Sequence, residues 1–179
     1  MLAQNNTGLI VIDIQGKLAK LVQDSNTLIS NTEKLIKGAK VLCLPIIVLE
    51  QNPSKLGSTT EELSILLDTV SPISKFSFNA CEEPALLEAM NNSNIKNWLI
   101  CGIEAHICVY QTVLSLFLAG IKVQVVSDCI SSRKLENKQL AIQKLLNLGV
   151  EITSLEMCLY EIMKDCKNPK FKEILPLIK

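Results

Sequence analysis

The stretch 97-NWLICGIEAHICVYQT-112 passes from an apolar run, through a glycine, into a segment with helical spacing. Its first part is a continuous apolar run, as in strands of parallel sheets that are covered on both faces. From residue 107 onward, the sequence ICVYQTVLSLFLA predicts an apolar helix. A strand followed at once by a helix is the repeating unit of α/β proteins. The stretch therefore predicts one such unit, with Cys108 in the first turn of its helix.

Runs of similar character recur along the chain. The clearest are 8-GLIVID-13, 45-PIIVLE-50 and 121-IKVQVVSD-128, and weaker strands are expected around 71–75 and 149–153. Helices are expected in the remaining segments, at about 27–41, 59–69, 83–91, 107–119, 133–147 and 168–178. Because parallel neighbours need right-handed crossovers, this alternation predicts a three-layer, doubly wound, mostly parallel six-stranded sheet of Rossmann-like type.

Length and composition limit the classes of protein that need to be considered. A chain of 179 residues, 48% hydrophobic and 20% charged, is expected to form a single globular domain over residues 1–179. Its 18 basic and 18 acidic side chains balance, so no attraction to nucleic acid or anionic lipid is expected. No apolar run approaches the roughly 20 residues that cross a bilayer, and no basic leader precedes the first strand. We therefore expect a cytoplasmic protein.

The seven cysteines are odd in number and form no CxxC pair. This pattern predicts neither a disulfide framework nor a zinc ribbon. Most of these thiols are expected to behave as small buried hydrophobic groups.

Reactive side chains follow several of the predicted strands. Asp13 ends the first strand, Glu50 and Gln51 stand at the end of the second, Lys75 ends the third, and the fourth leads through Gly102 to Cys108. Ligands of open parallel sheets bind beyond the carboxyl ends of the strands. Four separate segments are therefore predicted to meet at one edge of the sheet.

The chemistry of these groups suggests a thiol-based acyl-transfer site. A buried carboxylate and a buried ammonium are both costly unless they are paired, so Asp13 and Lys75 are expected to be partners. A thiol near a helix N-terminus and a cation is expected to have a pKa below the free value of about 8.5. Asp13 would then be the base, Lys75 the electrostatic partner and Cys108 the nucleophile. Taken singly, each has a structural alternative: a strand-end cap, a surface lysine and a core cysteine.

Several segments together resemble the isochorismatase-like cysteine hydrolase superfamily, and most of all its isochorismatase domain-containing subgroup. The resemblance runs in order along nearly the whole chain. The matching segments are LIVIDIQ (9–15), VLEQNPSKLG (48–57), SKFSFNA (74–80), CGIEAHICVYQT (101–112), VVSDCISSR (125–133) and NPKFKEILPLIK (168–179).

The resemblance implies an isochorismatase-like hydrolase fold and a catalytic triad of Asp13, Lys75 and Cys108. It also implies a cis peptide bond between Ile103 and Glu104, although neither residue is proline. The backbone N–H groups of Glu104 and Cys108 would then face the oxyanion of the substrate. Oxyanion donors of this kind contribute roughly 3–4 kcal/mol each where they have been measured by mutation.

The substrate pocket is expected to include Gln15, a strand-end hydrogen-bonding residue, together with Gln51, Phe76 and Phe78. Burial in the core is an equally good interpretation of the two phenylalanines. The chain has only seven aromatic side chains (Phe 4, Tyr 2, Trp 1), which favours a small substrate.

The chain departs from the metal-dependent nicotinamidases of the superfamily, which place an aspartate and two histidines near the second strand. Here the corresponding segment is 49-LEQNPS-54, and the chain has a single histidine. No metal site and no cofactor are therefore expected, and nicotinamidase activity is disfavoured. His106 is expected to be structural or to lie at the pocket rim, and Asp128 is expected to be structural.

Two functions follow from these observations. The complete Asp–Lys–Cys set favours a cysteine-dependent hydrolase that cleaves a C–N bond in a small amide or carbamoyl compound through a thioester. The alternative is a non-catalytic, homo-oligomeric interaction protein on the same scaffold. Nucleolytic activity is not expected, because the sequence shows neither a basic patch with interleaved aromatics nor a cluster of metal-binding carboxylates. Apolar residues in 107–119 and 155–163 predict a homodimer or a larger homo-oligomer.

Overall fold

A six-stranded sheet forms the centre of the computed structural model, which describes residues 1–179. Every neighbouring pair of strands is parallel, and the strand order is β3-β2-β1-β4-β5-β6. The predicted doubly wound α/β fold is confirmed. The strands are β1 (Thr7–Ile12), β2 (Ile46–Gln51), β3 (Ile73–Lys75), β4 (Asn97–Ile103), β5 (Lys122–Ser131) and β6 (Glu151–Thr153).

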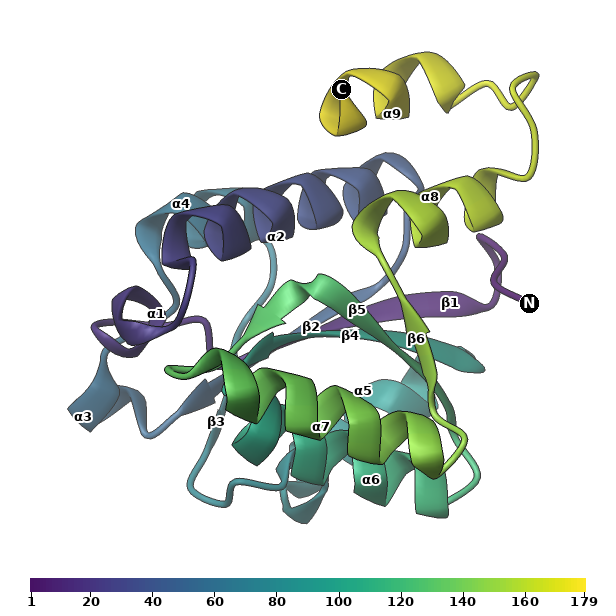
Figure 1. Ribbon diagram of the computed structural model, residues 1–179. Helices are drawn as coiled ribbons and strands as arrows, with labels where there is room; N and C mark the ends of the chain where they lie inside the picture. Colours follow the sequence, from purple (N-terminus) through teal and green to yellow (C-terminus); the bar gives the residue numbers. More distant parts are fainter.

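Helices cover both faces of this sheet. In Figure 1, α2, α4, α8 and α9 lie on one side of the sheet, and α5, α6 and α7 lie on the other. The helices are α1 (Leu18–Leu21), α2 (Ser25–Val41), α3 (Pro53–Leu56), α4 (Glu61–Ser64), α5 (Pro84–Asn92), α6 (Tyr110–Leu118), α7 (Leu135–Asn147), α8 (Leu155–Met163) and α9 (Phe171–Ile178). Three short turns complete the set: 3₁₀ turns η1 (Ile65–Leu67) and η2 (Ala80–Glu82), and the π-helical turn η3 (Ala105–Val109).

The side chains of β1 show why the sequences of the strands are continuous apolar runs. Leu9 and Val11 belong to the hydrophobic core beneath α2 and α8, whereas Ile10 and Ile12 belong to the core beneath α5, α6 and α7. A strand that is buried on both faces has no solvent-facing positions that need polar side chains.

The structure differs from the predicted elements in several places. The helices α1, α3 and α8 were not predicted, and the segment 59–69 forms the short α4 followed by η1. The predicted helix 107–119 is divided into the π-helical turn η3, which carries Cys108, and α6. The buried residues of α8 recur at helical spacing (Leu155, Cys158, Leu159, Ile162 and Met163), so its sequence does carry the periodicity that identifies an amphipathic helix. Its start is fixed by polar contacts: Leu155 N donates to Asp128 Oδ1 (2.8 Å) and Met157 N donates to Ser154 Oγ (3.2 Å). Asp128 therefore has the structural role that was expected.

No helix of the chain combines the length and the apolar character that a membrane span requires. The longest, α2, has 17 residues and includes several polar side chains on its exposed face.

Candidate active site

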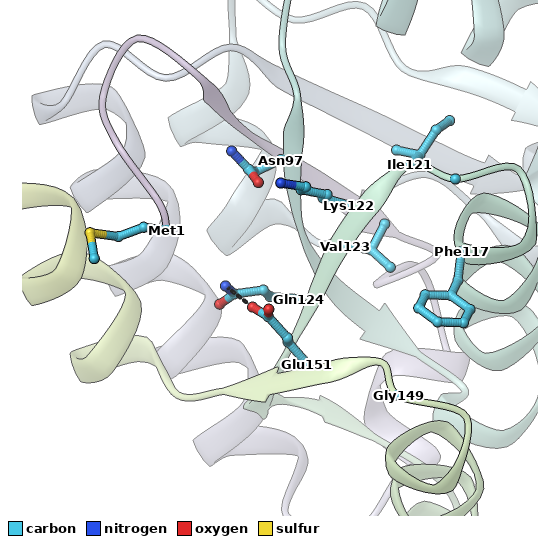
Figure 2. A pocket seen from close by; sticks show the side chains of 10 residues that line it. Met1, Asn97, Phe117, Ile121, Lys122, Val123, Gln124, Gly149 and Glu151 are labelled. Atoms are coloured by element: carbon cyan, nitrogen blue, oxygen red, sulfur yellow. Dashed lines mark hydrogen bonds between the residues drawn. The ribbon is translucent and has the colours of Figure 1, made fainter.

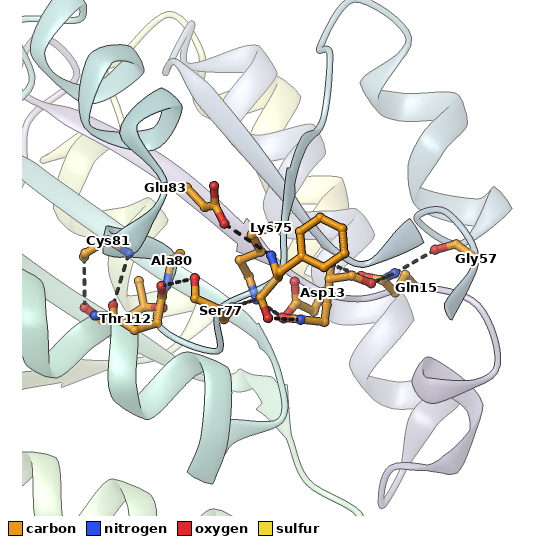
Figure 3. A network of polar contacts seen from close by, with 12 residues as sticks. Asp13, Gln15, Gly57, Lys75, Ser77, Ala80, Cys81, Glu83 and Thr112 are labelled. Atoms are coloured by element: carbon orange, nitrogen blue, oxygen red, sulfur yellow. Dashed lines mark hydrogen bonds and ion pairs between the residues drawn. The ribbon is translucent and has the colours of Figure 1, made fainter. Parts of the chain in front are cut away.

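A buried ion pair lies at the carboxyl edge of the sheet. Asp13 directly follows β1, and Lys75 is the last residue of β3. Lys75 Nζ lies 2.8 Å from Asp13 Oδ2, and both side chains are fully excluded from solvent. Figure 3 shows the two side chains pointing toward each other from their separate segments. The sequence-based pairing of these residues is thus present in the structure.

The ammonium group of Lys75 has two further acceptors. It donates to Gln51 Oε1 (2.7 Å) and to the carbonyl of Ser77 (3.3 Å). Gln51 is itself fixed, because its Nε2 donates to the carbonyl of Phe76 (2.6 Å). Lys75 therefore uses all three of its N–H donors, and its position is determined from three directions.

Cys108 lies beside this pair, in the π-helical turn η3 between β4 and α6, and is 7% exposed. Burial raises the pKa of its thiol from the ordinary value of 9.0 to about 12; the negative charge of Asp13 acts in the same direction, and Lys75 opposes both. The prediction of a lowered thiol pKa is therefore wrong for the resting site. Removal of the thiolate from water outweighs the nearby ammonium.

The pKa of Asp13 is raised as well. Burial is the main cause, and Lys75 and the Cys108 thiol partly offset it. The thiol lies near enough to shift the pKa of Asp13, but no hydrogen bond of regular geometry joins the two groups, and Asp13 Oδ1 has no partner. A carboxylate oxygen with a free lone pair beside a thiol is a suitable proton acceptor.

The turn that carries Cys108 begins with an unusual backbone. The peptide bond between Ile103 and Glu104 is cis, as the resemblance implied. The N–H of Glu104 donates to no protein acceptor, so it is available to a ligand. The side chain of Ile103 is fully buried and holds the start of the turn in the core.

The side chains of the turn bind the segment that follows β5. The buried carboxylate of Glu104 accepts from Arg133 Nε (2.9 Å) and from Arg133 N (3.0 Å). His106 Nδ1 lies 2.9 Å from Ser132 Oγ, and its Nε2 lies 3.3 Å from Asn137 Nδ2. Both ring nitrogens are therefore occupied, in agreement with a structural role for His106. The part played by Arg133 was not predicted, although a buried glutamate in the turn implies a cationic partner.

Gln15 was expected in the pocket wall, and this expectation is corrected by the structure. The side chain is completely buried; its Nε2 donates to the carbonyls of Gln51 (2.9 Å) and Gly57 (2.6 Å), and its Oε1 accepts from Gln51 N (2.7 Å). Figure 3 shows Gln15 reaching the chain at Gly57. Gln15 thus fixes the end of β2 and has no surface to offer to a substrate.

Phe76 and Phe78 follow Lys75 and are 75% and 56% exposed. The interpretation that they belong to the core is therefore wrong. Their place in a pocket wall remains a prediction, since large exposed aromatics commonly mark a surface that contacts a ligand or a partner.

A hollow of about 210 Å³ lies at the opposite, amino edge of the sheet. The residues drawn in Figure 2 include Asn97, Lys122 and Glu151, the first residues of β4, β5 and β6. Gln124 donates to Glu151 there. None of the predicted catalytic residues lines this hollow, so it is separate from the candidate active site.

The side chains present do not form a metal site. No three His, Cys, Asp or Glu side chains converge as a metal centre would require. The seven cysteines are all free thiols, and four of them are buried.

The fold and this edge of the sheet define a parallel α/β protein with a buried carboxylate, ammonium and thiol gathered beyond its strands. Residues 7–157 match the family model described as the isochorismatase domain. The chain belongs to the isochorismatase family.

Relatives and solved structures agree with this membership. The secreted isochorismatase effector Isc1 of Phytophthora sojae is 36% identical over 183 residues, covering 99% of this chain and 87% of that protein. Isochorismatase domain-containing protein 1 of Danio rerio is 34% identical over 168 residues; the match covers 93% of this chain but only 59% of the length of the fish protein. A structure described as the MAR1 ribonuclease of Caenorhabditis elegans superposes with a TM-score of 0.93 at 32% identity, over 99% of this chain and 91% of that one.

Proposed function

We propose that this protein is a cysteine-dependent hydrolase that cleaves the C–N bond of a small amide or carbamoyl compound through a thioester. The observation that supports this most strongly is the buried pair of Asp13 and Lys75, 2.8 Å apart and adjacent to the Cys108 thiol. A nucleophile beside a base that is itself oriented by a third group is the arrangement that covalent acyl transfer needs.

In the first half of the reaction, Cys108 Sγ bonds to the carbonyl carbon of the substrate while Asp13 accepts the thiol proton. The carbonyl oxygen becomes negatively charged, and the N–H groups of Glu104 and Cys108 donate to it. The C–N bond then breaks, and the proton held by Asp13 passes to the leaving nitrogen. The products of this half are a free amine or ammonia and an acyl group on Cys108.

In the second half, water attacks the thioester carbon and gives its proton to Asp13. The C–S bond breaks, the thiol recovers that proton, and the acid leaves. Because the resting thiol has a pKa of about 12, the site holds no standing thiolate at neutral pH. Proton transfer to Asp13 therefore accompanies the attack. The positive charge of Lys75 balances the Asp13 carboxylate in the resting site and the substrate oxyanion once Asp13 is protonated.

The surroundings of the triad favour a small substrate with an apolar group. Cys108 has little exposed surface, so only a compact carbonyl group can reach it. Phe76 and Phe78 are the exposed apolar side chains nearest in sequence to Lys75, and we assign them to the outer wall of the pocket. Gln51 contributes by holding Lys75, and its amide lies at the same edge.

The ribonuclease name of the C. elegans structure provides the main competing activity. RNA cleavage by general acid–base chemistry needs electrostatic complementarity to phosphates, and this chain carries 18 basic and 18 acidic side chains. A thiol, a carboxylate and an ammonium suit acyl transfer better than phosphoryl transfer. A non-catalytic interaction protein is the other alternative.

Turnover assays with matched cysteine variants distinguish these possibilities. We expect wild-type protein to release ammonia or amine from members of a panel of small amides and carbamoyl compounds. Cys108→Ala should reduce this rate about a thousandfold or more. Cys166→Ala, which removes an exposed thiol between α8 and α9, should retain it. Equal rates for the two variants, or cleavage of single-stranded RNA with no amide turnover, would contradict the proposal.

A further inference from the structure

The loop that follows Lys75 is attached to the helix that carries Cys108. Ala80 N donates to Thr112 Oγ1 (3.0 Å), and Cys81 Sγ lies 3.8 Å from the carbonyl of Thr112. Thr112 is completely buried, so its hydroxyl does not bind solvent and accepts from the loop instead. Figure 3 shows Thr112 beneath Ala80 and Cys81, in the same network as Lys75.

A second contact lies one turn further along α6. Asn79 Nδ2 donates to Ser115 Oγ (3.0 Å), and Asn79 Oδ1 accepts from Cys81 N (3.1 Å). Ser77 Oγ donates to the carbonyl of Asn79 (2.8 Å), and the carbonyl of Ser77 accepts from Lys75 Nζ (3.3 Å). Hydrogen bonds of the loop residues Asn79 and Ser77 therefore link α6 with the ammonium group of Lys75.

The sheet alone does not set the separation of Lys75 and Cys108. Lys75 ends β3, a strand of three residues at the edge of the sheet that pairs only with β2. Cys108 follows β4, and β2 and β1 lie between these two strands. Thr112 comes four residues after Cys108, close to the same face of the helix. The loop contact with Thr112 is thus a direct connection between the two sides of the site.

We propose that Thr112 is a positioning residue. Its hydroxyl holds the loop 76–82 so that the pair of Lys75 and Asp13 keeps its position relative to the Cys108 thiol. The inference rests on the proposed function, and it assigns a role to a residue that takes no direct part in the reaction steps above. Loss of the hydroxyl leaves Ala80 N without an acceptor and frees the loop to shift. Lys75 would then stabilise the developing thiolate less well.

The rate at which iodoacetamide alkylates Cys108 tests this, because it can be measured by peptide mass spectrometry without any substrate. Between pH 7 and 10, Thr112→Val should lower the rate about fivefold to tenfold, since displacements of an ångström at a reacting centre have effects of this size or larger. Thr112→Ser, which keeps the hydroxyl, should stay within about twofold of wild type.

Thr32→Val is the matched control. Thr32 is also completely buried in a helix, and its hydroxyl donates to the carbonyl of Leu28 (2.8 Å), but it lies in α2 on the other face of the sheet. It should leave the alkylation rate of Cys108 unchanged.

Equal rates for wild type, Thr112→Val and Thr112→Ser would overturn the inference, and so would equally slow Val and Ser variants. A faster rate in Thr112→Val would also overturn it, because the loop would then only shield the thiol. If Thr112→Val does not fold, Ser115→Ala weakens the neighbouring contact and should slow alkylation in the same direction; an unchanged rate there would count against the inference. Failure of the proposed function appears separately, as absence of amide turnover in wild-type protein.

Discussion

The pair of Asp13 and Lys75 is the only ion pair of the chain in which both side chains are fully buried. Such pairs rarely increase stability, because the loss of hydration can exceed the attraction between the charges. Asp13 also has a positive φ of 55°, which is uncommon for a residue other than glycine. A buried, paired and conformationally unusual carboxylate is better explained by chemistry than by stability.

Gln15 holds the backbone of Gln51, whose side chain in turn accepts from Lys75. Replacement of Gln15 is therefore expected to lower the stability of the fold. Gln15→Leu would leave the N–H of Gln51 and the carbonyls of Gln51 and Gly57 without their side-chain partner. We expect the free energy of unfolding to fall by about 2–4 kcal/mol, from the usual cost of unsatisfied buried polar groups. Urea denaturation measures this change.

Gln23→Leu is the matched control, since Gln23 is exposed and its side chain makes only a long contact with Asp24. Its effect should stay within about 0.5 kcal/mol. Similar losses of stability in both variants would mean that the hydrogen bonds of Gln15 contribute little.

At the scale of elements, the passage from β4 into the reactive turn depends on Gly102. Its φ is +134°, and a side chain at this position would collide with the carbonyl oxygen of Ile12 in the neighbouring strand. The pairing of β4 with β5 also shifts register between Ile100 and Gly102. The glycine therefore permits β4 to lie against β1 where the strand gives way to the turn that carries Cys108.

Two glycine variants distinguish the cost in stability of a steric clash from the cost of a positive φ alone. Gly120 has a φ of +78°, but no atom lies within 4 Å of the place that an added methyl group would occupy. Gly120→Ala should therefore cost only the conformational penalty of about 1–2 kcal/mol. Gly102→Ala should cost more than about 4 kcal/mol, the range of severe core disruptions. Thermal or urea unfolding would show this difference, and equal costs would contradict the crowding argument.

The elements also show how far sequence reasoning reaches. The strands could be predicted, because burial on both faces leaves continuous Ile- and Val-rich runs such as 9-LIVI-12. The helix α8 could also have been predicted, because Leu155, Cys158, Leu159 and Ile162 recur at helical spacing. The π-helical turn η3 could not, because no residue pattern distinguishes it from an ordinary first turn of α6.

At the scale of the whole molecule, the strand order brings together groups that are far apart in the sequence. Asp13 and Lys75 are separated by 62 positions and still form one ion pair. Their convergence could be predicted from the rule for parallel sheets. The raised pKa of Cys108 could not, because it depends on the depth of burial that the assembled helices produce. The contacts of Thr112 and of Arg133 were also not predicted, since they join segments with no recognisable pairing signal.

Buried thiols are expected to make the protein sensitive to alkali. Burial raises the pKa of Cys158 from 9.0 to about 12, so the folded state holds this proton more tightly than the unfolded state. The corresponding stabilisation is complete below pH 9 and is lost as the pH rises toward 12. Between these values the free energy of unfolding should fall by about 1.36 kcal/mol per pH unit for this group alone.

The variant Cys158→Ala isolates this contribution. Urea unfolding of the variant at several pH values between about 9 and 11 should give a slope that is smaller by about 1.4 kcal/mol per pH unit than that of wild type. Parallel slopes for the two proteins would show that the Cys158 thiol does not titrate on unfolding in this range.

Self-association remains a prediction for the whole molecule. Leu118 at the end of α6 is 73% exposed and Met157 in α8 is 63% exposed, and these helices cover opposite faces of the sheet (Figure 1). The two apolar regions therefore do not form one continuous face. Light scattering should give a mass above the 19.8 kDa of one chain, and either Leu118→Glu or Met157→Glu should lower it. A wild-type mass of one chain would contradict the prediction.

The most direct test of the proposed chemistry is the mass of the protein during turnover. Wild-type protein mixed with a substrate found in the amide panel, and quenched in acid within milliseconds to seconds, should gain the mass of the acyl group. Peptide analysis should place that group on Cys108, and Asp13→Asn should accumulate far less of it. An acyl group on any other residue, or steady turnover with no covalent adduct and full activity in Cys108→Ala, would contradict the account.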